Sequence, residues 1–275
     1  MTQSTAAVVG QFARDLVLSV DRLPESGSSG AATGRREQLG GKGANQAVAL
    51  AQLGVRPALV AVAGNDLIGD ELLAQARRDG VDVRAVVRRP GVLTSLIVEI
   101  LVAGEYRYVE DLLLLTEADV LSARAAIEAS DAVLVQLQQP VAAAVAAARI
   151  GHEAGRLVVL DGQITDRRLL ALADVVRADE KEADGLDERI LDQGPSLLAI
   201  ARPSGNLLIW SGGRVELSLT GGDPVDTTGG GDSFVAGLTA ALLRGASYEE
   251  AGRLATAASG STVGHPGGRP DLRDV

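Results

Sequence analysis

The stretch with the clearest chemical potential is 225–245, VDTTGGGDSFVAGLTAALLRG. It places Asp226 before the glycines at 229–231 and a second aspartate, Asp232, directly after them. From Asp232 onward, apolar residues recur at helical spacing up to Arg244–Gly245, which reads as a C-terminal stop. Glycine amides at the start of a helix bind anions because their donors are unpaired and the helix dipole is positive there. The pattern indicates an anion site.

The chemistry of Asp232 follows from its position beside such a site. A carboxylate cannot coordinate a phosphate as a cation would, so a proton acceptor for an attacking hydroxyl suits this place better. The alternative is an ordinary strand–helix turn in which Asp232 is the N-cap of the helix. A single glycine motif leaves both interpretations open.

A second glycine cluster also opens a predicted helix, LGGKGANQ at 39–46, with the helix ending at Gly54. It carries a cation, Lys42, and an amide, Asn45, which suit several hydroxyls or a phosphate. It is not a P-loop, because no Ser or Thr follows Lys42. The alternative is a plain helix start with a solvated lysine.

Predicted strands and helices alternate along most of the chain. The expected strands are 6–9, 57–63, 132–137, 157–160, a short one near Val175, 197–200 and 207–210. The expected later helices are 117–129, 140–154 and 248–263. Residues 93–102 and 105–111 read as a hairpin apart from this alternation. The pattern predicts a mainly parallel sheet with helices on both faces and one ligand cleft at the carboxyl ends of its strands.

Composition excludes several classes of protein. The 275 residues suffice for one large α/β domain, and 46% hydrophobic residues can form a sizeable core. A net charge of -10 argues against nucleic acid as a partner. The absence of cysteine excludes disulfides and thiolate metal sites. No apolar run reaches the length of a membrane span, and the N-terminus lacks a signal pattern, so we expect a soluble cytoplasmic protein.

Acidic residues follow two of the predicted strands. Asp161 comes after the strand 157–160, and 179–182 (DEKE) comes after the short strand near Val175. They are candidates for holding a metal ion or a water molecule, and the alternative is an ordinary solvated acidic loop.

The two glycine motifs together resemble the signatures of the ribokinase-like (PfkB-type) carbohydrate kinase family. GGKGANQAVALAQLG at 40–54 is similar to the first signature, and DTTGGGDSFVAGL at 226–238 to the second, usually written DTxGAGD. GNDLIGDEL at 64–72, followed by GVDV at 80–83, is similar to the pattern between them. The resemblance covers essentially the whole chain.

The resemblance implies a single domain, 1–275, with the ribokinase-like α/β three-layer sandwich. A small β-lid, formed by about 11–39 and 93–111, would close over a sugar and could form a homodimer. The implied activity is ATP-dependent phosphorylation of a hydroxymethyl group on a pentose-like sugar or a nucleoside, with Mg²⁺. Phosphoryl transfer of this kind depends on positioning and charge stabilisation.

The resemblance also implies roles for individual residues. Asp232 would be the general base, and the amides of Gly229, Gly230 and Gly231 the anion hole. The implied sugar-binding residues are Asp15, Gly41, Lys42, Asn45 and Gln138. The implied nucleotide and Mg²⁺ positions are Asp179, Glu182, Ser204 and Gly205. Asp226 and Thr228, with carbonyls of the 262–271 tail, match positions for a monovalent cation such as K⁺.

Several positions depart from the family pattern. Ala13 stands where the family has an Asn, and Gln138 where it has an acidic sugar contact, so ribose itself is in doubt. On the nucleotide side, 179–182 keeps only the Glu of the N-x-x-E element, and 202–205 (RPSG) replaces Gly-Ser-Arg-Gly. Residues 112–115 replace a Gly-Ala-Asn element.

These departures keep two other functions open. One is a family member of little or no activity that binds a sugar or a nucleoside as a sensor. The other is a hydrolase, since 231–234 (GDSF) resembles the GDS box of certain esterases. That box would need a late Asp-x-x-His, and His265 has no such aspartate before it. The intact Asp232 and its glycines favour the kinase.

Overall fold

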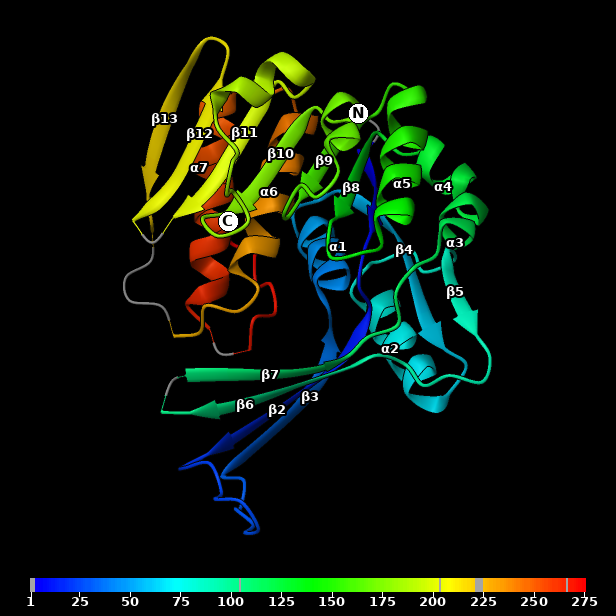
Figure 1. Cartoon of the computed structure of the whole chain (residues 1–275), viewed down its shortest axis with the longest axis vertical. Helices are drawn as coiled ribbons and strands as arrows, with labels where there is room; N and C mark the ends of the chain where they lie inside the picture. The colour runs from blue at the N-terminus through cyan, green and yellow to red at the C-terminus, as the bar shows by residue number, and fades with distance from the viewer. Residues whose placement is uncertain (1–2, 104, 203, 221–224, 266) are drawn as a thin grey trace.

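The computed structural model describes residues 3–103, 105–202, 204–220, 225–265 and 267–275. In that part of the chain the strands form a large sheet and a small sheet (Figure 1). The strands of the large sheet are, in spatial order, β13 (Gly213–Ser218), β12 (Gly205–Trp210), β11 (Leu197–Arg202), β10 (Val175–Asp179), β9 (Leu157–Asp161), β8 (Ala132–Gln136), β1 (Thr5–Val9), β4 (Arg56–Gly64) and β5 (Val86–Arg89).

The large sheet is mainly parallel, as the sequence predicts. All pairings from β5 through β11 are parallel, and only β12 and β13 run antiparallel at one edge. The central strands are continuous apolar runs such as AVLVQ in β8, whose residues are all buried. Such runs suit a sheet covered on both faces.

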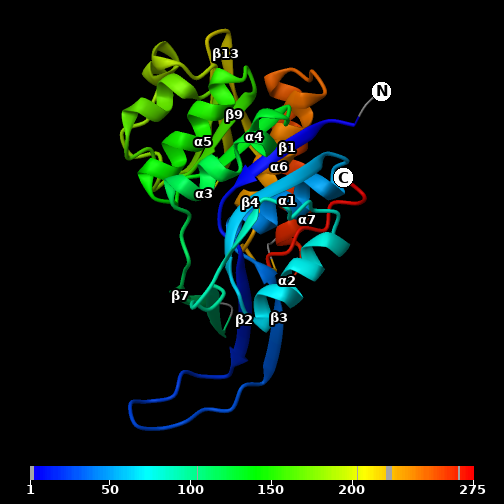
Figure 2. The same cartoon turned by 90° about the vertical axis from the view of Figure 1, so that its right-hand side faces the viewer.

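Helices cover both faces of the large sheet (Figure 2). One face packs against α1 (Lys42–Gln52), α2 (Leu67–Arg78), α6 (Gly230–Leu243) and α7 (Tyr248–Val263). The other packs against α3 (Glu117–Ser122), α4 (Arg124–Glu128), α5 (Val141–Glu153) and the 3₁₀ helices η1 (Arg167–Leu172) and η2 (Glu188–Gln193). The three-layer α/β fold is therefore confirmed. Because many core side chains are alanines, the helices approach the sheet and one another closely.

Some elements differ from the sequence prediction. The predicted helix 117–129 is two short helices, α3 and α4, which meet at Ala123. The hydroxyl of Ser122 donates to the carbonyl of Asp119 at 2.6 Å, a local bond that competes with the helical ladder. The strands β5 and β13 were not predicted. β13 is a short edge strand with few apolar residues and gives a weak sequence signal.

The small sheet has the order β3 (Gly34–Gly40), β2 (Ala13–Val20), β6 (Leu96–Val102), β7 (Glu105–Asp111). It projects from the end of the large sheet at which β1 leads into β2 (Figure 1). Its strands show period-2 burial, with Asp15 and Glu99 buried between partly exposed neighbours. We call the face that carries Asp15, Ile97, Glu99, Tyr108 and Glu110 the inner face, and these residues share one side by register.

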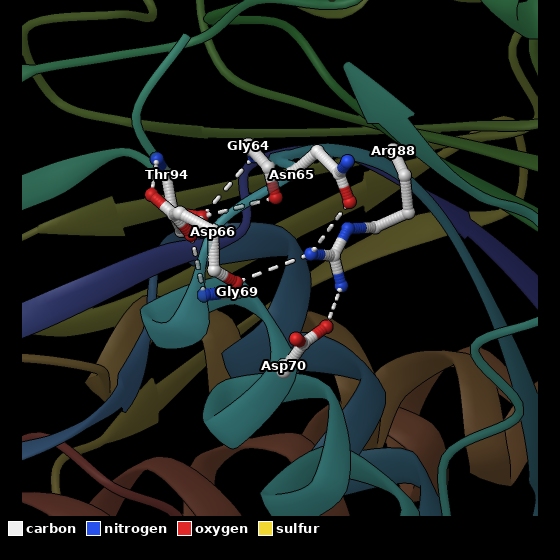
Figure 3. Close-up of polar contacts among 7 residues, drawn as sticks. All are labelled: Gly64, Asn65, Asp66, Gly69, Asp70, Arg88 and Thr94. Carbon is white, nitrogen blue, oxygen red and sulfur yellow. Dashed lines mark hydrogen bonds and ion pairs between the residues drawn. The ribbon is translucent and has the colours of Figure 1, made fainter. Parts of the chain in front are cut away.

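A cluster of polar contacts fixes the start of β6 to the main body of the fold (Figure 3). Asp66 is the N-cap of α2, and its carboxylate accepts from the amide of Gly69 at 2.7 Å. The same carboxylate accepts from the amide of Thr94 at 2.8 Å and from its hydroxyl at 2.6 Å. Beside it, Arg88 of β5 forms an ion pair with Asp70 of α2 at 2.6 Å. The small sheet therefore begins from a fixed point next to β4.

Candidate active site

A cavity of about 620 Å³ lies between the carboxyl ends of the large-sheet strands and the inner face of the small sheet. The structure brings eight sequence-predicted residues together in its wall: Asp15, Gly41, Lys42, Asn45, Gln138, Thr228, Gly229 and Asp232. They come from β2, the start of α1, the segment after β8 and the start of α6. Both glycine motifs therefore face one cleft, as expected for a parallel sheet.

The start of α6 has the geometry of an anion site. Gly229 is the N-cap with φ 71°, and within the described residues no side chain caps the helix. A Cβ at Gly229 would overlap the carbonyl of Gly268, so the turn requires glycine. Asp232 is the third residue of α6. The alternative interpretation of Asp232 as the N-cap is therefore wrong, and the first-turn amides are left to bind an anion.

Asp232 is held by two amide side chains of α1. Asn45 donates from Nδ2 to one carboxylate oxygen at 3.2 Å, and Gln46 donates from Nε2 to the other at 3.2 Å. Asp232 is only 6% exposed. Burial raises its pKa, Lys42 acts to lower it and Asp161 to raise it, and the result is about 6. At neutral pH Asp232 is thus ionised yet more basic than an ordinary aspartate, as a general base requires.

A buried ion pair lies behind Asp232. Asp161, the last residue of β9, accepts from Nη1 of Arg177 at 2.9 Å and from Nε2 of Gln46 at 2.8 Å. The Arg177 side chain, in β10, is 8% exposed. Its Nη2 lies 2.7 Å from the point where a Cβ of Gly231 would stand. Asp161, a candidate metal or water holder by sequence, is therefore engaged by Arg177, which places a positive charge directly beneath the anion site.

Lys42 is half-buried beside the same carboxylates. Burial acts to lower its pKa, but attraction by Asp161, Asp232 and Glu182 outweighs burial and raises it. Lys42 is thus a permanent cation on the large-sheet side of the cavity.

The loop before α6 is tied to the C-terminal tail and to the small sheet. Asp226 is buried and accepts from the amide of Thr228 at 2.9 Å and from the amide of Gly267 at 2.5 Å. The hydroxyl of Thr228 hydrogen-bonds to the hydroxyl of Tyr108 at 3.1 Å. These contacts hold the carboxylate of Asp226 in one orientation. Residue 266, within the tail expected to supply carbonyls to a cation, lies outside the described residues.

The four residues expected on the nucleotide side do not line this cavity. Asp179 accepts from the amides of Lys181 at 2.9 Å and Glu182 at 2.8 Å, so it closes its own turn. A carboxylate oxygen of Glu182 lies 4.0 Å from Nη1 of Arg177, which brings Glu182 to the buried charges. Ser204 and Gly205 lie where β11 turns into β12, and Pro203 between them and Arg202 lies outside the described residues.

Sequence reasoning missed seven residues of the cavity wall: Gln11, Ile97, Glu99, Tyr108, Glu110, Leu112 and Leu114. Gln11 lies beside Gln138 in the wall and donates from Nε2 to its Oε1 at 3.4 Å. Glu99 is the one charged residue in the strand LIVEILV. Alternate residues of a strand share one face, so the sequence could have indicated that Glu99 lies on the same face as Ile97.

The buried carboxyls of the inner face have raised pKa values. Burial, with repulsion from Glu99 and Asp232, raises the pKa of Asp15 to about 8. Burial, with repulsion from Asp226, raises the pKa of Glu99 to about 7. The small-sheet side of the cavity therefore holds two carboxyl groups that are largely or partly protonated at neutral pH, a property that the glycine motifs do not indicate.

Comparison with known proteins identifies the family. The model of the pfkB family carbohydrate kinases matches residues 3–274. A ribokinase from Haemophilus influenzae is 30% identical over 299 residues, covering 98% of this chain and 95% of the relative. A nucleoside kinase from Methanothermobacter thermautotrophicus is 25% identical over 285 residues, covering 97% of this chain and 92% of the relative.

Among the residues described, none of the helices combines the length and the apolar character that crossing a membrane needs.

Solved structures confirm the fold. The ribokinase of Arabidopsis thaliana, solved with ribose and ATP, superposes with a TM-score of 0.81 at 24% identity, covering 97% of this chain and 94% of that one. The ribokinase of Thermotoga maritima gives a TM-score of 0.83 at 24% identity, covering 97% and 94%. The ribokinase relatives imply ATP as the phosphoryl donor. The chain belongs to the PfkB family of carbohydrate kinases, as a ribokinase-like enzyme that phosphorylates a sugar hydroxyl.

Proposed function

We propose that the chain transfers the γ-phosphoryl group of ATP to a hydroxymethyl group of a pentose-like sugar, with Asp232 as the general base. The observation that supports this most directly is the start of α6. There Asp232, with its pKa raised to about 6, lies in the cavity wall next to helix amides that no described side chain caps. A base and an anion site side by side suit a hydroxyl that attacks a phosphoryl group.

In this proposal each group of site residues has a separate role. Asp15, Gly41, Lys42, Asn45 and Gln138 bind the sugar hydroxyls and orient one of them toward Asp232. Asp232 takes the proton of that hydroxyl as it attacks. The amides of 229–231 and the positive end of α6 stabilise the charge on the transferring group, a contribution of about 10²- to 10³-fold per donor in comparable sites. The small sheet acts as the lid and excludes water from the cavity.

The cation sites belong to the same proposal. Within the described residues, no group of three or more His, Cys, Asp or Glu is placed to hold a metal ion. Mg²⁺ does not require such a group, because proteins often bind it through one or two carboxylates together with substrate phosphates. Glu182, at 4.0 Å from Arg177, is the best-placed carboxylate, with Asp179 beside it. Ser204 and Gly205 are the proposed nucleotide contacts, and Asp226 and Thr228 the proposed site for K⁺.

A nucleoside is the second candidate substrate. Ile97, Tyr108, Leu112 and Leu114 give the cavity an apolar and aromatic section that suits a base. The similarity to a nucleoside kinase over 97% of the chain supports this candidate. A homodimer through the outer face of the small sheet, where Val109 is 65% exposed, is proposed on the resemblance alone.

The test is ADP formation with Mg-ATP and K⁺ across pentoses, hexoses and nucleosides, run beside Asp232→Asn. We expect this variant to lose about 10²- to 10⁴-fold in kcat while sugar binding persists, because only the proton acceptor is removed. Asp192→Asn, at an exposed position, is the matched control. Turnover of Asp232→Asn near that of the control would refute the role of the base. Binding without turnover in the wild type would favour the sensor.

A further inference from the structure

We call the inner face of the small sheet the roof of the cavity. It carries more acidic side chains than the proposed phosphoryl transfer uses. Asp15 is 6% exposed and Glu99 is 4% exposed, and both line the cavity together with Glu110. Oδ1 of Asp15 and Oε2 of Glu99 are buried and have no hydrogen-bond partner among the described residues. The cavity wall therefore contains two buried carboxyl groups whose hydrogen-bonding capacity the described chain does not fill.

Among the residues that the structure describes, no basic side chain forms an ion pair with Asp15 or Glu99. The charge of Lys42 is attracted by Asp161, Asp232 and Glu182 on the opposite side of the cavity. Arg36 attracts both Asp15 and Glu99. Over the residues that the structure describes, however, neither carboxylate lies within 4.0 Å of a basic nitrogen as an ion pair.

A purely structural role explains Glu99 poorly. In the described residues its side chain makes no hydrogen bond that would hold β6 to a neighbouring strand. An apolar residue at this inner-face position would pack as Ile97 does, without the cost of burying a charge. Burial and repulsion by neighbouring carboxylates raise the pKa values of Asp15 and Glu99, and neither the amide of Gly41 beside Asp15 nor the attraction of Arg36 offsets this. A cationic group of a ligand would supply a partner for their ionised forms.

We propose that the substrate carries a protonated amine, which Asp15 and Glu99 bind against the roof while a hydroxyl at the other end of the molecule faces Asp232. The substrate class is thus an amino sugar. This inference rests on the proposed function and deepens it by naming the group that distinguishes this substrate from a neutral pentose. Charge-assisted hydrogen bonds between the ammonium and two buried carboxylates would supply the selectivity.

The test is calorimetric binding of matched sugars to the full chain. The pairs are D-ribose with 2-amino-2-deoxy-D-ribose and with 3-amino-3-deoxy-D-ribose, and D-glucose with D-glucosamine. For at least one pair we expect the amino member to bind about 10- to 100-fold more tightly. Glu99→Gln should reduce that preference to less than about threefold, because the amide keeps the shape and removes the charge.

Glu105→Gln is the matched control, since Glu105 belongs to β7 but lies on the outer face and outside the cavity wall. It should keep the full preference. Equal binding of the amino and neutral members to the wild type would overturn the inference, and this comparison does not depend on any variant folding. A preference that survives in Glu99→Gln would overturn the role of Glu99.

ADP formation with the same sugars separates the two proposals. If none of these sugars is phosphorylated but the amino members bind more tightly, the proposed transfer to a pentose-like sugar fails and the amine site remains. Phosphorylation of neutral sugars, with no preference for an amine in binding or in kcat/KM, would do the reverse.

Discussion

The carboxylates at and behind the large-sheet side of the cavity, namely Asp161, Asp226 and Asp232, which we call the floor, differ from those of the roof in their partners. On the floor, Asp232 accepts two side-chain amides, Asp161 is paired with Arg177, and Asp226 accepts two backbone amides. On the roof, Asp15 and Glu99 each keep a buried oxygen without a partner in the described chain. A floor whose groups are held in place is preorganised for one chemical step. A roof with unmet hydrogen-bonding capacity is completed only by its substrate.

The largest effect is expected from removing the buried ion pair between Arg177 and Asp161. Arg177→Met would leave Asp161 buried without its partner, and we expect a loss of about 3–5 kcal/mol in the free energy of unfolding, measured by urea denaturation. Arg189→Met removes an exposed pair with Asp187, and its expected loss is under about 1 kcal/mol. Losses of similar size in the two variants would mean that the floor is not stabilised by its buried pair.

The pH profile of the proposed reaction tests the floor in solution. Asp232 must be ionised to accept a proton, and its pKa is raised to about 6. Below that pH the protonated fraction grows, so kcat/KM should fall about tenfold per pH unit. The measurement is initial ADP formation from pH 4.5 to 8.5 at low sugar concentration. A profile that is flat down to pH 5 would contradict the raised pKa.

The smallest effect is expected for Glu99→Gln on the roof, which should increase the free energy of unfolding rather than reduce it. The pKa of Glu99 is raised to about 7 in the fold, so protonation stabilises the fold at low pH and this contribution is lost as pH rises through 7. Glu99→Gln has no charge to bury. At pH 8, without ligand, it should unfold about 1 kcal/mol less easily than the wild type, after discounting for solvent screening.

At pH 4 the wild-type Glu99 is already protonated, and the gain should vanish there. Thermal unfolding of Glu99→Gln and of the outer-face control Glu105→Gln at the two pH values measures the difference. A variant that is less stable than the wild type at pH 8 would show that Glu99 supports the fold through a contact of its own.

What the sequence predicted well depended on local patterns. The helix α7 begins at Tyr248 and ends at Val263, the bounds expected from the sequence. Both glycine motifs open a helix, as predicted, because the signals for a turn and for a helix start lie within a few residues of each other. The helix α6 begins at Gly230, two residues before Asp232, because the three glycines themselves form its first turn and cap.

What the sequence did not predict depended on pairing between distant segments. Arg177 meets Asp161 only because β9 and β10 are neighbours in register, which places these residues opposite each other. Glu99 reaches the cavity because β6 pairs in parallel with β2, and a shift of one residue would turn it outward. The family resemblance supplied Asp15 and Gln138, but it says nothing about side chains that the family pattern does not specify.

The hydrogen bonds of Asp66 affect the order in which carboxylates become protonated as the pH falls. Hydrogen bonds from Thr94 and Gly69 outweigh burial and hold the pKa of Asp66 below its usual range. The roof carboxyls of Asp15 and Glu99, by contrast, take up protons already near pH 8 and pH 7. On a downward titration Asp15 and Glu99 are therefore neutralised well before Asp66. Mild acid thus removes these two charges from the cavity while Asp66 still accepts the hydrogen bonds that hold the start of β6.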